Sequence, residues 1–159
     1  MDYRPSRPRI GRSSLLSIAF AILLGTGLYL ELLADANWNA GEVVLAGHVV
    51  LGLGFTVVFA SWIGGHVRRG LRTASRQAFR RLSWFLLTLY VLLVATGLLM
   101  VLPTTLYLVG VLWFWRFETT GVLTFVHFWG ALAATMALFA HLAMRHWRLP
   151  MARRGHEAS

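Results

Sequence analysis

Residues 43–66 read VVLAGHVVLGLGFTVVFASWIGGH, and their only ionisable side chains are two histidines, His48 and His66. A helix needs about 20 consecutive apolar residues to cross a bilayer, and this stretch is long enough. An imidazole in hydrocarbon is costly, so an ionisable residue inside a membrane span indicates a functional site. The stretch therefore predicts a membrane helix that carries two functional histidines.

Three further apolar stretches predict three more membrane helices. Together with 43–66, the predicted spans are about 13–33, 82–102 and 119–146. The sequence thus predicts an all-α fold, a transmembrane four-helix bundle that forms a single membrane domain over residues 1–159.

The boundary of the third span depends on one proline. No charge occurs from Leu82 to Trp115, which is too long a stretch for one membrane helix. Pro103 divides it, because proline ends or kinks a helix near the residue before it. Residues 106–115 are short and aromatic, and they are predicted to form a helix that lies at the membrane interface.

Composition and charge support a membrane protein. The chain is 57% hydrophobic and 13% charged, and its mean hydropathy is +0.63. It has no cysteine, which excludes disulfides, iron–sulfur clusters and thiolate ligands within the chain. All 15 basic residues are arginine, and they cluster beside apolar stretches rather than on a soluble surface. A nucleic-acid partner is therefore not expected, and the lipid bilayer is.

The arginine clusters also predict an orientation. They lie at the N-terminus, at 68–81 and at the C-terminus, whereas the other two connections carry acidic residues. Cytoplasmic loops are rich in arginine and lysine, so both termini are predicted to be cytoplasmic. The expected location is the bacterial inner (cytoplasmic) membrane, as a multi-pass protein.

Four histidines fall into two pairs at matching depths. The last predicted span carries His127 and His141, and it runs in the same direction as 43–66. His48 and His127 should lie near the outer face, and His66 and His141 near the inner arginine clusters. This pairing predicts an outer site, His48 with His127, and an inner site, His66 with His141.

Helical periodicity places both histidines of each span on one face. At about 100° per residue, His48 and His66 point in the same direction around the helix axis. His127 and His141 differ in direction by only about 40°. The two steps differ by four residues, or about 6 Å of rise. Helix tilt can absorb part of this difference. If it does not, His146 is the nearest substitute ligand for the inner site.

Small residues beside the histidines suggest room for a flat macrocycle. A row of glycine and alanine either lets helices touch closely or leaves space for a cofactor. The candidate haem-packing residues are Gly52, Gly130 and Ala134, with further room at Gly27 and Gly97 and porphyrin-edge contacts at Phe55 and Phe59.

Haem explains the pairs better than the alternatives do. Zinc or copper would need three or four clustered ligands, whereas the two pairs are separated by about 20–27 Å at 1.5 Å per residue. A proton relay would usually add a carboxylate within the spans. We therefore expect two b-type haems, with the four histidines as axial ligands to the haem iron. Histidines bonded only to neighbouring carbonyls remain the alternative.

A short motif occurs twice. Thr26-Gly27-Leu28 near the end of the first span is repeated as Thr96-Gly97-Leu98 in the third. Each copy precedes an outer connection and a helix with two histidines. The pattern is consistent with duplication of a helical hairpin or with chance, since small residues are common in membrane helices.

These features resemble the b-type cytochrome subunits of formate dehydrogenases and nickel-iron hydrogenases, and the N-terminal four-helix bundle of cytochrome b. The resemblance rests on the 14-residue spacing of His127 and His141 and on the Thr-Gly-Leu motif. The first span lacks the histidine that the dehydrogenase subunits often place there. Taking both remaining ligands from the second span is closer to cytochrome b, although the spacing there is usually 14.

The expected function is electron transfer across the membrane between a periplasmic redox partner and quinone. Bis-histidine ligation leaves no open iron position, which favours electron transfer over oxygen binding. A chain of this size would act as the electron-transfer subunit of an oxidoreductase complex rather than as a stand-alone enzyme. The alternatives are a haem-free membrane anchor or assembly subunit of a larger complex, and a small proton or metal transporter.

Overall fold

The computed structural model describes residues 12–68 and 77–146, and within them the chain is helical with no strand. The elements in chain order are α1 (Arg12–Leu32), a short 3-10 helix η1 (Ala34–Ala36), α2 (Trp38–His66), α3 (Gln77–Leu108) and α4 (Phe117–His146). Each of the four α-helices is long and apolar enough to cross a membrane. The predicted all-α bundle of four membrane-spanning helices is confirmed.

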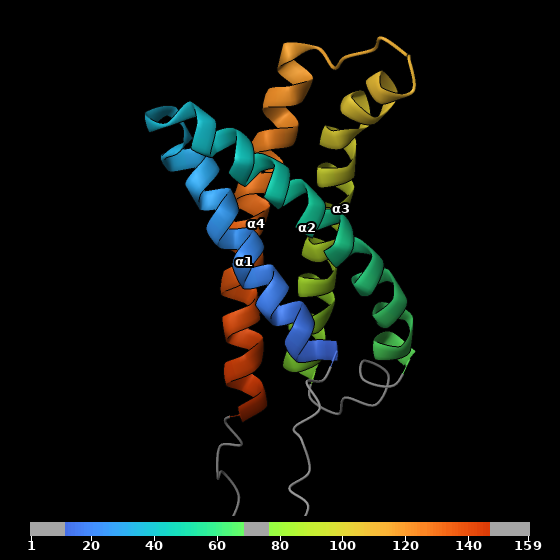
Figure 1. Ribbon diagram of the computed structural model, residues 1–159. Coiled ribbons are helices and arrows are strands. Elements are labelled where there is room, and N and C mark those ends of the chain that lie inside the picture. Colours follow the sequence, from blue (N-terminus) through green and yellow to red (C-terminus); the bar gives the residue numbers. More distant parts are fainter. Residues whose placement is uncertain (1–11, 69–76, 147–159) are drawn as a thin grey trace, which may run out of the picture.

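The helices form two antiparallel hairpins. α1 packs along α2, and α3 packs along α4 (Figure 1). The two connections within the hairpins, η1 and residues 109–116, lie at one end of the bundle, which we call the connection end. α1 starts and α4 ends at the opposite end, which we call the terminal end. This even number of crossings agrees with the predicted placement of both termini on one side.

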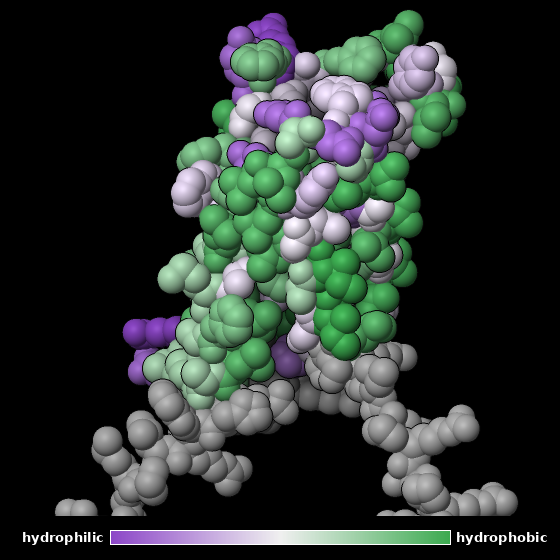
Figure 2. All heavy atoms as spheres, turned by 60° about the vertical axis from the view of Figure 1, so that its left-hand side comes forward, coloured by the Kyte–Doolittle hydropathy of each residue, from purple (hydrophilic) through white to green (hydrophobic). Residues whose placement is uncertain are grey.

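The surface agrees with a bilayer environment. Figure 2 shows apolar side chains along the length of the bundle and hydrophilic ones gathered mainly at the connection end. The arginine clusters that predict the orientation lie largely outside the described residues. The orientation relative to the cytoplasm therefore stays a prediction.

α2 begins five residues earlier than its apolar stretch suggests. Asn37 caps the helix, because its side-chain oxygen accepts a hydrogen bond from the backbone N–H of Ala40 at 3.1 Å. Glu42, the charge that sets the predicted limit, lies in the exposed second turn and accepts a bond from the Trp38 indole at 2.8 Å. The charge is tolerated because this part of α2 is at the connection end.

The predicted helix break at Pro103 and the separate helix over 106–115 are wrong. α3 continues through Pro103 to Leu108, and residues 111–116 are not helical. Proline has no N–H, so the Leu99 carbonyl four residues earlier loses its helical donor. The Trp115 indole N–H donates to that carbonyl instead, at 2.8 Å. The connection thus folds back onto α3 and satisfies the atom that proline orphans.

α3 ends in a regular glycine cap. Gly110 has a φ of 86°, which glycine adopts without steric cost. The N–H of Gly110 donates to Tyr107 O at 3.0 Å, and the N–H of Val111 donates to Leu106 O at 2.9 Å. These two bonds form a Schellman motif, which ends helices at a glycine. The sequence signal for the end of α3 was therefore Gly110 rather than Pro103.

An aromatic cluster joins the two hairpins. Phe20 of α1 lies edge-on against Tyr90 of α3, with ring centroids 5.1 Å apart. Phe55 and Phe59 of α2 stack on each other at 5.8 Å and also contact Tyr90. All three phenylalanines are buried. This cluster fills the bundle on the terminal-end side of His48, where the sequence suggested porphyrin edges.

Candidate functional site

The predicted outer histidines are brought together across the two hairpins. His48 of α2 and His127 of α4 are half-buried, and their ring centroids lie 6.3 Å apart with the ring planes at 76°. They are 79 positions apart in the chain, so only the packing of one hairpin on the other makes them neighbours. The facing rings form the candidate site.

Each ring is held by a threonine from the neighbouring helix of its own hairpin. His48 Nδ1 lies 2.8 Å from Thr26 Oγ1 of α1. His127 Nδ1 lies 2.9 Å from Thr96 Oγ1 of α3. Nδ1 is therefore engaged in both rings, which leaves Nε2 as the nitrogen available to a ligand.

The glycine after each threonine lets the ring approach the helix. A methyl group added at Gly27 would lie 3.4 Å from His48 Cε1, and one added at Gly97 would lie 3.3 Å from His127 Cε1. These spacings lie at or just below ordinary van der Waals contact, so an added methyl group would press on the ring. Gly27 and Gly97 provide room for the imidazoles, and the further room for a macrocycle expected there stays a prediction.

The two Thr-Gly-Leu segments are therefore structural equivalents. In both hairpins the threonine bonds the histidine Nδ1, and a methyl group added at the glycine would touch Cε1 of the same ring. The repeated motif indicated where these residues occur but not which atoms they contact. Thr26 and Thr96 are the site residues that sequence reasoning missed, and the repeat was the signal that could have found them.

His141 is placed by the same kind of contact farther along the second hairpin. Its Nδ1 lies 3.2 Å from Ser83 Oγ of α3, and its ring lies 4.6 Å from that of Phe79. Ser83 is buried, and its hydroxyl is 2.8 Å from Phe79 O. The hydroxyl–histidine pairing seen at the facing histidines thus recurs at His141.

The predicted inner pair is not brought together in this way. His66 is exposed and stacks on Trp62 of its own helix, with ring centroids 4.0 Å apart. The ends of α2 and α4 that carry His66 and His141 stand apart at the terminal end of the bundle (Figure 1). The assignment of these two histidines to one haem stays a prediction. The side chain of His146, the predicted substitute ligand, is not among the side chains that the structure describes.

The three small residues expected beside a haem lie against neighbouring helices. A methyl group at Gly52 would come 3.9 Å from Leu23 of α1, and one at Gly130 would come 3.5 Å from Leu93 of α3. Ala134 is completely buried in the core. Their described contacts are helix–helix contacts within each hairpin, and a haem contact for them stays a prediction.

The donor set suits a cofactor that needs only two protein ligands. Within the described residues, no group of three or more His, Cys, Asp or Glu side chains could hold a metal ion. A bare zinc or copper ion would need such a group. A haem would need only two ligands from the protein, which is the number that His48 and His127 offer.

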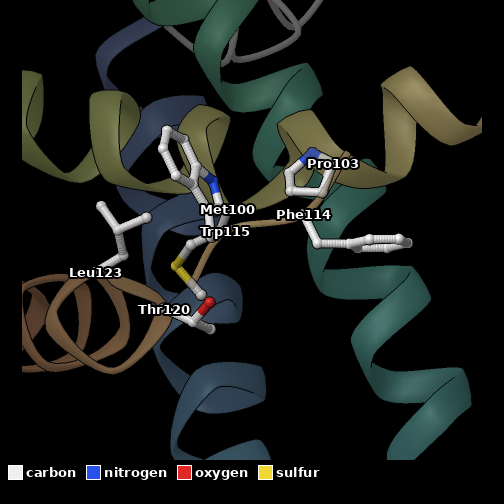
Figure 3. A pocket seen from close by; sticks show the side chains of 6 residues that line it. All are labelled: Met100, Pro103, Phe114, Trp115, Thr120 and Leu123. Atoms are coloured by element: carbon white, nitrogen blue, oxygen red, sulfur yellow. The ribbon is translucent and has the colours of Figure 1, made fainter. Parts of the chain in front are cut away.

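A pocket of about 220 Å³ lies at the connection end next to this site. Figure 3 shows its lining side chains, which come from α3, the following connection and α4: Met100, Pro103, Phe114, Trp115, Thr120 and Leu123. Leu123 precedes His127 by one helical turn, and Met100 follows Thr96 by one turn, or about 6 Å along the axis. The pocket therefore adjoins the His127 side of the candidate site.

No protein-family model, no curated protein and no solved structure matches this chain.

Proposed function

We propose that the protein is a membrane-integral b-type cytochrome that transfers electrons through a haem held between His48 and His127. The observation that carries this proposal is the 6.3 Å separation of the two ring centroids. A histidine nitrogen binds a transition metal at about 2 Å, so two imidazoles on opposite sides of one metal have centroids about 6 Å apart. The angle of 76° between the rings is compatible with such a pair, because each ring can rotate about its metal–nitrogen bond.

The chain's own residues would hold and shield the group. The two histidines would bind the iron, while the threonines and glycines of the repeated motif would fix the ring orientation. A haem supplies one-electron redox chemistry when it is bound. Two histidine ligands leave no iron position for substrate or oxygen, so electron transfer is the activity that this geometry favours.

We place quinone exchange at the pocket of Figure 3. A cavity of about 150 Å³ lined by apolar side chains can hold a benzene ring, so about 220 Å³ is enough for a substituted one. Aromatic and thioether side chains line the pocket, and the Thr120 hydroxyl offers a polar contact. Its position one helical turn from His127 keeps the electron path short. The other electron partner would be a periplasmic redox subunit of an oxidoreductase complex in the bacterial inner membrane.

A second haem, between His66 and His141, belongs to the same proposal. The Ser83 contact orients His141 as the threonines orient the outer histidines. His66 would have to approach it from the separated end of α2. Two haem equivalents per chain would support the second site, and one equivalent would overturn it.

The test begins with the visible spectrum and haem content of the purified protein. Dithionite reduction should give the bands of a b-type haem, and His48→Ala and His127→Ala should each remove the same haem. His156→Ala, in the C-terminal tail, is the control. A featureless spectrum would exclude the cytochrome and favour the haem-free anchor or the proton or metal transporter.

Quinone exchange has its own test. The protein is first reduced with dithionite, and the excess reductant is removed. A short-chain quinone should then oxidise the haem. Leu123→Trp, which fills the pocket, should slow this oxidation at least tenfold. Val122→Trp is the matched control, because Val122 directly precedes Leu123 on α4 and is 62% exposed. Equal oxidation rates in the two variants would contradict a quinone site at this pocket.

A further inference from the structure

Each threonine hydroxyl beside a histidine has one proton but lies within hydrogen-bonding distance of three atoms. Thr26 Oγ1 lies 3.0 Å from Ile22 O, 3.0 Å from Leu23 O and 2.8 Å from His48 Nδ1. A hydroxyl has one proton to donate and lone pairs to accept with. The two backbone carbonyls can only accept. The hydroxyl proton is therefore directed to its own helix, the usual arrangement for threonine within a helix.

The remaining contact then fixes the histidine proton. With the hydroxyl proton given to the carbonyls, Thr26 Oγ1 faces His48 Nδ1 with a lone pair, so the proton in that bond belongs to Nδ1. A neutral imidazole carries its proton on one nitrogen only. His48 Nε2 is therefore an unprotonated lone pair.

The second hairpin gives the same result independently. Thr96 Oγ1 lies 2.8 Å from Leu92 O, 3.1 Å from Leu93 O and 2.9 Å from His127 Nδ1. Its proton also goes to its own helix, which leaves His127 with a proton on Nδ1 and a lone pair on Nε2. Two imidazoles with lone pairs on Nε2 cannot hydrogen-bond to each other through those nitrogens. A Lewis acid between the rings can satisfy both.

We infer that Thr26 and Thr96 are positioning residues that lock both histidines in the tautomer with Nδ1 protonated and so prepare both Nε2 atoms to bind one metal. This inference rests on the proposed function and adds to it how the ligands are oriented and tuned. A histidine that donates its other N–H to a fixed acceptor is a more basic ligand and stays in the right orientation. The threonines therefore raise haem affinity and favour the ferric state.

Four variants and one control test this role in the haem-loaded protein. Thr26→Val and Thr96→Val keep the side-chain shape but remove the acceptor, whereas Thr26→Ser and Thr96→Ser keep the hydroxyl. Thr88→Val is the matched control, because the Thr88 hydroxyl is exposed and bonds only Trp84 O of its own helix. The readouts are the rate of haem transfer to a scavenging apo-globin and the reduction potential.

The valine variants should lose haem about 10–100 times faster than the wild type, the usual cost of removing such a partner. They should also shift the reduction potential upward, while the serine variants and Thr88→Val behave as the wild type does. A fold effect alone would change haem loss without rescue by serine. Unchanged transfer rates and potentials in both valine variants would overturn the inference.

A haem-independent measurement separates this inference from the proposed function. Histidine nitrogen-15 spectra of protein purified from haem-deficient cells report which ring nitrogen carries the proton. His48 and His127 should both show a protonated Nδ1, and Thr26→Val should release His48 alone. Wild-type protein that never binds haem would refute the cytochrome while these spectra still test the threonines. Protonated Nε2 in both wild-type rings would refute the threonine role.

Discussion

At the residue scale, the site depends on two small contacts that occur once in each hairpin. The threonine hydroxyl sets the proton and direction of each imidazole, and the glycine beside it lets the ring lie against the helix. Depth and helical azimuth were enough to predict the outer histidine pair. They could not predict the hydroxyl partners, because a threonine within a helix also satisfies itself on its own backbone. Only the packing of neighbouring helices decides which threonine meets a ring.

The glycines give a residue-scale prediction. Gly27→Ala and Gly97→Ala should displace the imidazole rings, since the added methyl groups would lie 3.4 and 3.3 Å from the ring carbons. We expect haem content to fall by at least half in each variant, measured as the pyridine haemochrome.

Two other glycines supply the controls for this prediction. Gly25 on α1 and Gly121 on α4 have no neighbouring atom within 4 Å of an added methyl group. Alanine at these positions should keep full haem content and can stabilise the helix by up to about 1 kcal/mol. Equal haem loss in Gly25→Ala and Gly27→Ala would refute the close-approach argument.

At the element scale, the sequence predicted which stretches are helical better than it predicted where they end. Uninterrupted apolar stretches of membrane length identified all four helices. The errors came from local hydrogen bonding that composition does not show. Pro103 remains inside α3 because a tryptophan twelve residues later supplies the missing donor, and α2 starts early because Asn37 caps it.

The Trp115 bond to Leu99 O gives an element-scale prediction. Trp115→Phe should lower the free energy of unfolding by about 0.5–1.5 kcal/mol, because it removes the indole hydrogen bond to that carbonyl. Pro103→Ala restores a backbone N–H, which can donate a hydrogen bond to the same carbonyl. The tryptophan substitution should therefore cost less in the Pro103→Ala background, as measured by thermal or denaturant unfolding in detergent.

Trp84→Phe is the control for this cycle, since Trp84 is exposed and lies on α3 far from Pro103 along the helix. It should change stability little in either background. Strictly additive effects of Trp115→Phe and Pro103→Ala would show that the indole does not replace the missing proline donor.

At the whole-molecule scale, the protein consists of two hairpins that meet at the aromatic cluster and at the facing histidines. The sequence predicted that the histidines of α2 and α4 lie at matching depths, but it did not predict the separation of these two helices at the terminal end. Helix tilt sets that separation, and tilt depends on packing partners rather than on the length of an apolar stretch. The outer histidines therefore meet in the structure, whereas the pairing of His66 with His141 stays a prediction.

A haem that bridges α2 and α4 should stabilise the whole molecule. A ligand that binds only the folded state adds about 4 kcal/mol when its concentration is about 1,000 times its dissociation constant. Haem-loaded protein should therefore unfold at a higher temperature than haem-depleted protein in the same detergent. His48→Ala should abolish the difference, whereas His156→Ala should preserve it. The same unfolding temperature with and without haem would argue against a bridging haem.

The arrangement of the hairpins also has a consequence for molecular assembly. α1 starts and α4 ends at the same end of the bundle, whereas the pocket and the facing histidines lie toward the other end. A soluble domain joined to either terminus would stand in the same compartment as a domain joined to the other. Such a fusion would leave the connection end uncovered, so the protein can be tethered, tagged or immobilised at the terminal end while the proposed electron partners reach the pocket and the facing histidines.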